Sequence, residues 1–264
     1  MISPLASIHP NAKLGNNVTV DPFAVIHDNV IIGDGTHIMS NAVLMPYSRI
    51  GKECRIFPGA VIGAVPQDLK FIGEETTAEV GDYTTIREYV TINRGTKDKW
   101  KTAVGSHCLL MAYVHIAHDC IVGDHVILAN GVQLAGHVEV GDYAIIGGLA
   151  AANQFTRIGA HTYIGGQSAI RKDVPPFVKA AREPLSYAGI NLVGLQRRNF
   201  KQDQIETISR IYHLLFVGNH TVSNGIQKIN EELPDSDLKS EIIYFIQSSK
   251  TGVIRRPSKN GNED

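Results

Sequence analysis

The segment HIAHDCIVGDH, residues 115–125, holds three of the chain's 11 histidines together with two aspartates. Side chains of these types can bind a metal ion, or a histidine can act as a general base beside a carboxylate that orients it. A third possibility is a polar surface without chemistry. The choice depends on where the fold directs His115, His118 and Asp119, so the elements that carry them must be found first.

An aliphatic residue recurs at every sixth position from Ile2 to Ile170, and 26 of the 29 positions follow this rule. The residue two positions earlier is small throughout the regular part of the pattern. A helix repeats every 3.6 residues and a single strand every two. A strict period of six therefore predicts a coil of short strands joined by turns, with both sets of residues directed inward.

Glycines recur at multiples of 18 residues, which predicts that three hexads form one coil of a three-sided prism. We expect these glycines to supply a left-handed backbone at one corner. The cysteines Cys54, Cys108 and Cys120 fall on the small inward positions, so we interpret them as packing residues and not as a disulfide framework. The recurring glycines are Gly15, Gly33, Gly51, Gly105, Gly123, Gly141 and Gly159.

The pattern divides the chain into two expected domains. A mainly β domain, a parallel β-helix, covers residues 1–185, with loops that leave the prism near 63–79 and 95–103. An α-helical domain covers residues 186–264, because apolar residues at helical spacing follow a proline-rich exit and a second helical segment ends before Gly252. We expect the last dozen residues to fray.

The charges nearly balance, with 25 Lys and Arg against 26 Asp and Glu, so no global field attracts nucleic acid or an anionic membrane. The short basic run of Arg255, Arg256 and Lys259 is interpreted as a solvated tail. The N-terminus lacks the pattern of a secretory signal, and no apolar run is long enough to cross a bilayer. We therefore expect a cytoplasmic protein with no nucleic-acid partner and no stable membrane insertion.

The hexads predict the direction of the opening histidines. Ile116 and Val122 point inward, so His115, His118 and Asp119 lie on outward or corner positions. Residues 18 apart stack in adjacent coils, and this places three further residues in the same column: Gly136 over His118, His137 over Asp119, and Gln154 over Gly136.

Two chemistries fit this column equally well. A histidine beside a carboxylate can take a proton from a substrate, and a glycine N–H can stabilise an oxyanion. Alternatively, histidines from adjacent coils or subunits can hold zinc with one open position for water. Spacing alone leaves both readings open.

Several segments together resemble one known family: HIAHDC, LANGVQLAGHVEVGDYAIIGG, QDLK, INRGT and GINLVGLQRRNF. This ordered set is similar to the UDP-N-acetylglucosamine O-acyltransferase family, whose members open lipid A synthesis in Gram-negative bacteria. The resemblance covers nearly the whole chain. It implies a left-handed parallel β-helix with a helical C-terminal domain, a homotrimer with active sites in the clefts between subunits, and no cofactor or metal.

The resemblance also implies residue roles. His118 is the expected general base, which deprotonates the glucosamine 3-hydroxyl of UDP-N-acetylglucosamine for attack on the thioester of a 3-hydroxyacyl chain on acyl carrier protein. Asp119 is expected to orient His118, and the Gly136 N–H to hold the oxyanion. Gly166 adds no bulk to the acyl groove, which predicts a long chain. The remaining implied substrate-binding residues are Asp68, Lys70, His115, His137, Gln154, Asn191, Arg197 and Arg198.

Three alternatives are weighed against this reading. A zinc-dependent γ-type carbonic anhydrase shares the prism, but QDLK, the helical C-terminal domain and the missing histidine spacing argue against it. A non-catalytic trimeric scaffold predicts that His118→Ala has no effect on any activity. The related N-acyltransferase is disfavoured because the hexads begin at Ile2, which leaves no room for its additional N-terminal domain.

Overall fold

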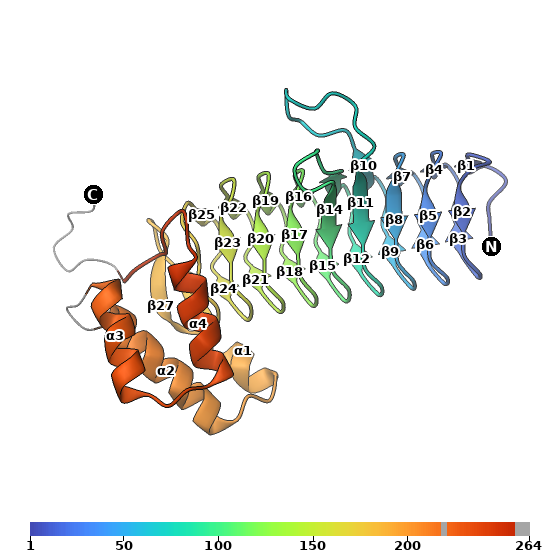
Figure 1. Cartoon of the computed structure of the whole chain (residues 1–264). Helices are drawn as coiled ribbons and strands as arrows, with labels where there is room; N and C mark the ends of the chain where they lie inside the picture. The colour runs from blue at the N-terminus through green and yellow to red at the C-terminus, as the bar shows by residue number, and fades with distance from the viewer. Residues whose placement is uncertain (218–220, 257–264) are drawn as a thin grey trace.

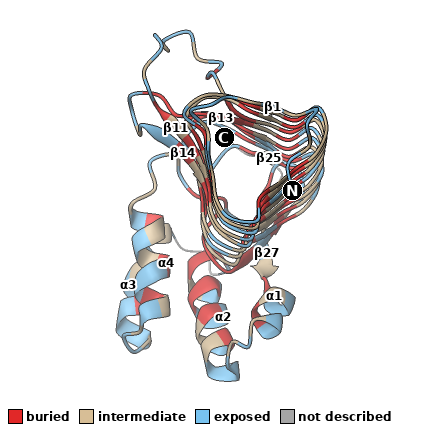
Figure 2. Ribbon diagram, turned by 90° about the vertical axis from the view of Figure 1, so that its right-hand side faces the viewer, coloured by how far each residue is buried: buried red, intermediate tan, exposed pale blue. Residues whose placement is uncertain are grey.

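A computed structural model describes residues 1–217 and 221–256. Three β-sheets wind around a common axis and enclose a three-sided prism, seen along its axis in Figure 2. Every strand pairing in these sheets is parallel except the last, between β26 and β27. The expected parallel β-helix is confirmed.

We number the faces of the prism in chain order. Face 1 contains β1 (Ser7–Ile8), β4 (Val25–Ile26), β7 (Val43–Leu44), β10 (Val61–Ala64), β13 (Thr91–Asn93), β16 (His115–Ile116), β19 (Gln133–Leu134), β22 (Ala151–Ala152) and β25 (Ala169–Ile170). Face 2 contains β2 (Lys13–Leu14), β5 (Ile31–Ile32), β8 (Ser48–Ile50), β11 (Thr77–Val80), β14 (Lys101–Val104), β17 (Ile121–Val122), β20 (Glu139–Val140) and β23 (Arg157–Ile158). Face 3 contains β3 (Thr19–Val20), β6 (His37–Ile38), β9 (Arg55–Ile56), β12 (Thr85–Ile86), β15 (Leu109–Leu110), β18 (Ile127–Leu128), β21 (Ile145–Ile146), β24 (Tyr163–Ile164), β26 (Val178–Ala181) and β27 (Ser186–Ile190).

Both inward sets of residues form the core of the prism. From Val20 to Ile170 the regular aliphatic positions are buried, and the small positions between them are buried as well. Burial raises the pKa of Cys108 to about 11 and that of Cys120 to about 12, so both thiols stay protonated and serve packing. Ile2 is 54% exposed because no earlier coil covers it.

The recurring glycines have a different role from the one expected. None of them has a positive φ, so the prediction of a left-handed backbone at these positions is wrong. They are needed for close packing, since a Cβ on Gly123 would lie 2.2 Å from Asp142 Oδ1 and one on Gly141 would lie 2.5 Å from the Ala160 nitrogen. The left-handed positions come two residues later, for example at His125 and Tyr143.

Two loops leave the prism at the corner between faces 1 and 2. They span residues 65–76, between β10 and β11, and residues 94–100, between β13 and β14. Strands paired across the first loop are offset by 30 residues, as in Val61↔Thr91, and those across the second by 24, as in Thr77↔Lys101, whereas regular coils are offset by 18. Both insertions are multiples of six, so the hexad pattern resumes in phase. Figure 1 shows the longer loop standing away from the prism above β10.

In the described part of the chain, four helices follow β27 and lie at the C-terminal end of the prism (Figure 1). They are α1 (Leu192–Arg197), α2 (Gln202–Phe216), α3 (Val222–Glu232) and α4 (Asp237–Gln247). In α2 the apolar residues at helical spacing are buried, and the Tyr212 hydroxyl donates to the Pro176 carbonyl at 2.6 Å. The helical pattern had not indicated α3, although Thr221 caps its N-terminus.

The division near residue 186 remains our proposal, and β27, which begins there, still pairs with β26. The first residues of the tail that we expected to fray are held against the prism: Ile254 donates its N–H to the Asp173 carbonyl at 3.0 Å. The rest of that tail, residues 257–264 with Lys259, lies outside the described residues. Of the helices in the described part of the chain, none has the length and apolarity needed to span a membrane.

Candidate active site

His118 and Asp119 lie at the corner between faces 1 and 2, directly after β16. Both point away from the prism interior, as the hexads predicted, yet His118 is only 6% exposed and Asp119 is fully buried. The 94–100 loop covers them, and it supplies hydrogen bonds to the aspartate from Thr96 and Lys99. The pair is therefore neither part of the core nor part of a solvated surface.

The two side chains form a short hydrogen bond, with His118 Nδ1 donating to Asp119 Oδ2 at 2.8 Å. Burial on its own would raise the pKa of Asp119, but hydrogen bonds from His118, Thr96 and the Lys99 backbone together lower it below its ordinary value. Asp119 is thus ionised at neutral pH. With Nδ1 protonated toward the carboxylate, Nε2 of His118 carries the free lone pair of a base.

Gly136 lies over His118 in the next coil, where a side chain would have no room. A Cβ at this position would lie 2.6 Å from His118 Cε1 and 2.7 Å from Nε2. Within the described residues, the N–H of Gly136 donates to no other group. The glycine therefore makes room for the His118 ring, and its backbone N–H is an unused donor beside that ring.

His137 follows and packs edge-on against His118, with ring centroids 5.1 Å apart. Its Nε2 is 3.9 Å from Asp119 Oδ2, and its Nδ1 is 3.1 Å from Asp98 Oδ2 without hydrogen-bond geometry. The ring stacks on Phe155 at 4.5 Å. The predicted column is confirmed as a structural unit.

His118, Asp119 and His137 also form the group in the described part of the chain whose potential ligand atoms lie close enough together to bind a metal ion. One ligand atom each from His118, Asp119 and His137 lie within 4.8 Å of one another. However, both oxygens of Asp119 already accept hydrogen bonds from Thr96, Lys99 and His118. A carboxylate with its lone pairs occupied in this way orients a base more readily than it binds a cation.

Two other predicted residues flank this column. On face 1, His115 Nδ1 lies 2.7 Å from the Thr91 hydroxyl, and burial lowers the pKa of this histidine. Gln154 is exposed in the coil after Gly136.

The predicted residues Asp68 and Lys70 lie on the outer 65–76 loop. Asp68 Oδ1 accepts the Lys70 N–H at 2.9 Å, which shapes the loop, while the Lys70 side chain is exposed. The loop stands away from the prism (Figure 1), so within one chain these two residues are not packed against His118.

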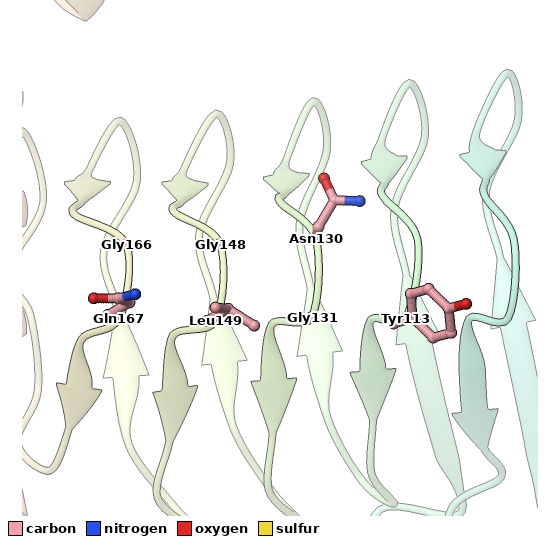
Figure 3. Close-up of a pocket in the computed structure, with 7 residues that line it drawn as sticks. All are labelled: Tyr113, Asn130, Gly131, Gly148, Leu149, Gly166 and Gln167. Carbon is pink, nitrogen blue, oxygen red and sulfur yellow. The ribbon is translucent and has the colours of Figure 1, made fainter.

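Gly166 lines a groove of about 740 Å³ at a different corner, between faces 3 and 1. Figure 3 shows this groove running across successive coils. A Cβ on Gly166 would lie 3.0 Å from the Gly148 carbonyl oxygen, so the glycine packs closely on the preceding coil and adds no side chain to the groove. The lining residues are Tyr113, Asn130, Gly131, Gly148, Leu149, Gly166 and Gln167.

The predicted C-terminal residues surround α1. The Asn191 side chain accepts the Gly194 N–H at 3.3 Å and donates to the His161 carbonyl at 2.9 Å, so both ends of its amide are engaged. Arg198 donates to the Tyr143 carbonyl at 2.9 Å and packs over that ring, but its Nη1 is buried without a partner. Arg197 is exposed.

The sequence reasoning missed Thr96, Lys99 and Thr102, which together hold Asp119. The hydroxyl of Thr96 donates to Asp119 Oδ2 at 2.7 Å, and the N–H of Asp119 donates to the Thr102 hydroxyl at 2.8 Å. The loop was recognised only as an interruption of the hexads. The sequence did hold a signal for Thr96. A buried carboxylate needs hydrogen-bond donors, and the segment INRGT, which ends at Thr96, leads into the loop just before the coil that carries Asp119.

A prism built from hexapeptide repeats is the architecture of the hexapeptide transferases. The family model described as bacterial transferase hexapeptide (six repeats) matches residues 11–46, 29–64 and 101–136, and the model for UDP-N-acetylglucosamine O-acyltransferase, domain 2, matches residues 173–254. The match to the second model covers all of α1, α2, α3 and α4.

Relatives at high identity span nearly the whole chain. The acyl-[acyl-carrier-protein]–UDP-N-acetylglucosamine O-acyltransferase of Sulfurihydrogenibium sp. (strain YO3AOP1) is 52% identical over 98% of this chain and 96% of its own. That of Aquifex aeolicus (strain VF5) is 57% identical over 76% and 77%. A crystal structure of a UDP-N-acetylglucosamine acyltransferase from Bacteroides fragilis superimposes with a TM-score of 0.95 at 48% identity, covering 97% of this chain and all of that one.

The chain belongs to the UDP-N-acetylglucosamine O-acyltransferase family. Its fold is accordingly the left-handed parallel β-helix with C-terminal helices, as the resemblance implied.

Proposed function

We propose that this protein transfers a 3-hydroxyacyl chain from acyl carrier protein to the 3-hydroxyl of UDP-N-acetylglucosamine, the first step of lipid A biosynthesis. The names of its relatives support this reaction and its two substrates. The observation that carries the proposal is the buried His118–Asp119 pair, which sits under a glycine whose missing side chain makes room for the His118 ring. We propose the cytoplasm as its location.

In the proposed mechanism, His118 Nε2 removes the proton from the sugar 3-hydroxyl as its oxygen attacks the thioester carbonyl carbon. A C–O bond forms, and the carbonyl oxygen becomes an oxyanion that the Gly136 N–H stabilises. The C–S bond then breaks, and the departing thiolate takes the proton from the His118 imidazolium. Asp119 keeps Nδ1 protonated and stabilises the imidazolium while it exists.

We assign the remaining roles to the residues around this centre. Asp68 and Lys70 contact acyl chain and sugar from the 65–76 loop, and His115, His137 and Gln154 line the cleft. Asn191 and the two arginines contact nucleotide or the phosphopantetheine of the carrier. The unpaired Nη1 of Arg198 supports a role in binding an anionic group.

We further propose a homotrimer with active sites between subunits. His118 and Gly166 lie at different corners of one prism, on opposite edges of face 1. One acyl chain can reach both residues if His118 of one copy meets the Gly166 groove of another. Because Gly166 leaves that groove open, we propose that it accepts a long 3-hydroxyacyl chain.

The test is to incubate the purified protein with UDP-N-acetylglucosamine and 3-hydroxyacyl carrier protein. We expect acyl transfer by the wild type and a loss of about 10²- to 10⁴-fold in kcat for His118→Ala, the range that general-base catalysis contributes. Thermal unfolding of the variant checks that it folds. Absence of transfer by the wild type would overturn the proposed function and favour a non-catalytic scaffold, whereas an equally active His118→Ala would overturn the role of His118 as the general base. Zinc that co-purifies with the wild type and is lost from the variant would favour the metal reading.

A further inference from the structure

The 94–100 loop holds Asp119 through two different kinds of donor. The backbone N–H groups of Thr96 and Lys99 donate to Oδ1 at 3.0 and 3.1 Å, and the Thr96 hydroxyl donates to Oδ2 at 2.7 Å. Thr96 is therefore bonded to both oxygens of the carboxylate. It is itself only 7% exposed, so water has little access to replace these bonds.

The loop is anchored, so its donors are in place before any substrate arrives. The Gly95 N–H donates to the Thr77 carbonyl at 3.1 Å, and the Trp100 N–H closes the loop onto the Thr96 carbonyl at 2.8 Å. Beyond the loop, the Lys99 ammonium pairs with Glu139 in the coil that carries Gly136, at 2.7 Å. The loop is thus tied to the coils on both sides of His118.

Oδ2 of Asp119 is the oxygen that orients His118, and it is shared with one other donor at hydrogen-bond distance, the Thr96 hydroxyl. Rotation about the Cβ–Cγ bond moves both oxygens together, so the two backbone bonds to Oδ1 already resist it. The Thr96 hydroxyl adds the restraint that acts directly on Oδ2, the oxygen that faces the imidazole. On the backbone side, Asp119 is held in a left-handed conformation with φ of 60°.

We propose that Thr96 is a positioning residue of the acyl transfer, which acts on catalysis by holding Asp119 Oδ2 against His118. This inference rests on the proposed function. It assigns to the 94–100 loop a catalytic purpose beyond closing the prism, although no atom of Thr96 needs to touch the substrate.

The test compares Thr96→Val, which keeps the shape and the backbone N–H but removes the hydroxyl, with Thr96→Ser, which keeps the hydroxyl. We expect Thr96→Val to lower kcat by about tenfold or more, the effect of one hydrogen bond to a charged group. KM for UDP-N-acetylglucosamine should stay within about twofold, and Thr96→Ser should recover most of the lost rate. Thr84→Val is the matched control, because the buried Thr84 hydroxyl donates to the Gly105 carbonyl away from the site.

A double-mutant cycle then asks whether Thr96 acts through Asp119. In an Asp119→Ala background, Thr96→Val should cost almost nothing further. Additive losses, an unchanged kcat in Thr96→Val, or the same loss in Thr84→Val would each overturn the inference. A wild type without acyl transfer would instead contradict the proposed function, so the two failures are distinguishable.

Discussion

At the scale of single residues, the candidate site depends on space as much as on charge. His118 has its base nitrogen free because Asp119 occupies the other nitrogen, and the ring fits because Gly136 has no side chain. Gly136 does not have a positive φ, so its requirement for glycine is steric and not conformational. A substitution at Gly136 should therefore displace the His118 imidazole without straining the backbone.

We therefore predict that Gly136→Ala lowers kcat by about 10²-fold, because the new methyl group displaces the His118 ring from Asp119. The fold should survive, since the added group meets a side chain that can move. Steady-state kinetics with thermal unfolding checks both statements. Gly165→Ala is the matched control, as a Cβ there would meet its nearest atom at 3.7 Å. Wild-type kinetics in Gly136→Ala would contradict this account of the glycine.

At the scale of elements, a stack of aromatic and histidine rings connects the prism to the C-terminal helices. It follows the corner between faces 2 and 3, with successive centroids 4.5 to 5.5 Å apart, and Phe200 packs edge-on against His161 near its end. The stacked rings are Tyr83, His107, His125, Tyr143, His161 and Phe177. Six side chains that are far apart in sequence thus form one continuous contact.

His161 makes this contact sensitive to pH. Burial, followed by the charge of Arg198, lowers the pKa of His161 to about 4, against about 6.5 in the unfolded chain. Between these values the unfolded chain binds a proton that the native state does not. The free energy of unfolding therefore falls as the pH drops from about 6.5 to 4, by about 2 kcal/mol once solvent screening is allowed for.

We predict that His161→Phe removes this part of the pH dependence. The buried Nδ1 of His161 has no partner, so the apolar ring should cost little stability at pH 7. Urea unfolding at pH 7 and pH 4.5, at fixed protein concentration, measures the difference. Tyr143→Phe keeps the imidazole and should keep the wild-type dependence. The assignment to His161 fails if both variants lose stability in acid as the wild type does.

At the scale of the whole molecule, the proposed trimer would bring together two sites that one chain holds apart. The His118 column and the Gly166 groove lie on separate corners, and the coil geometry fixes that separation. If the proposed trimer forms, two variants with different defects should complement each other.

We predict that Gly166→Met shifts the optimum toward shorter acyl chains, and that His118→Ala is inactive. Co-expressed, the two variants should regain transfer of the wild-type chain length, because some clefts then combine His118 of one copy with Gly166 of another. A series of carrier-bound chains of graded length, tested on each variant alone and on the mixture, gives the measurement. A single-chain site predicts no recovery. An unchanged optimum in Gly166→Met would refute the proposal that the side chain at position 166 limits the length of the acyl chain.

Much of the fold could be predicted because its rule is local. Each hexad directs one aliphatic and one small residue inward, so the core, the outward direction of His118 and the stacking of Gly136 over it follow from counting residues. The cause is geometric: a coil that closes every 18 residues places equivalent positions directly over one another. The resemblance to the family added the handedness, which a period of six leaves open.

Other features were decided only by the tertiary structure, because they depend on contacts between segments with no shared period. The 94–100 loop folds back to bury Asp119 and supplies Thr96, and the recurring glycines are needed by the neighbouring coil and not by their own φ. The tertiary structure likewise decided that Gly166 and His118 lie at different corners of the prism. The sequence alone determined which residues face inward and which column could react. The packing of loops and corners decided how that column is held and that the groove beside Gly166 lies at a different corner from it.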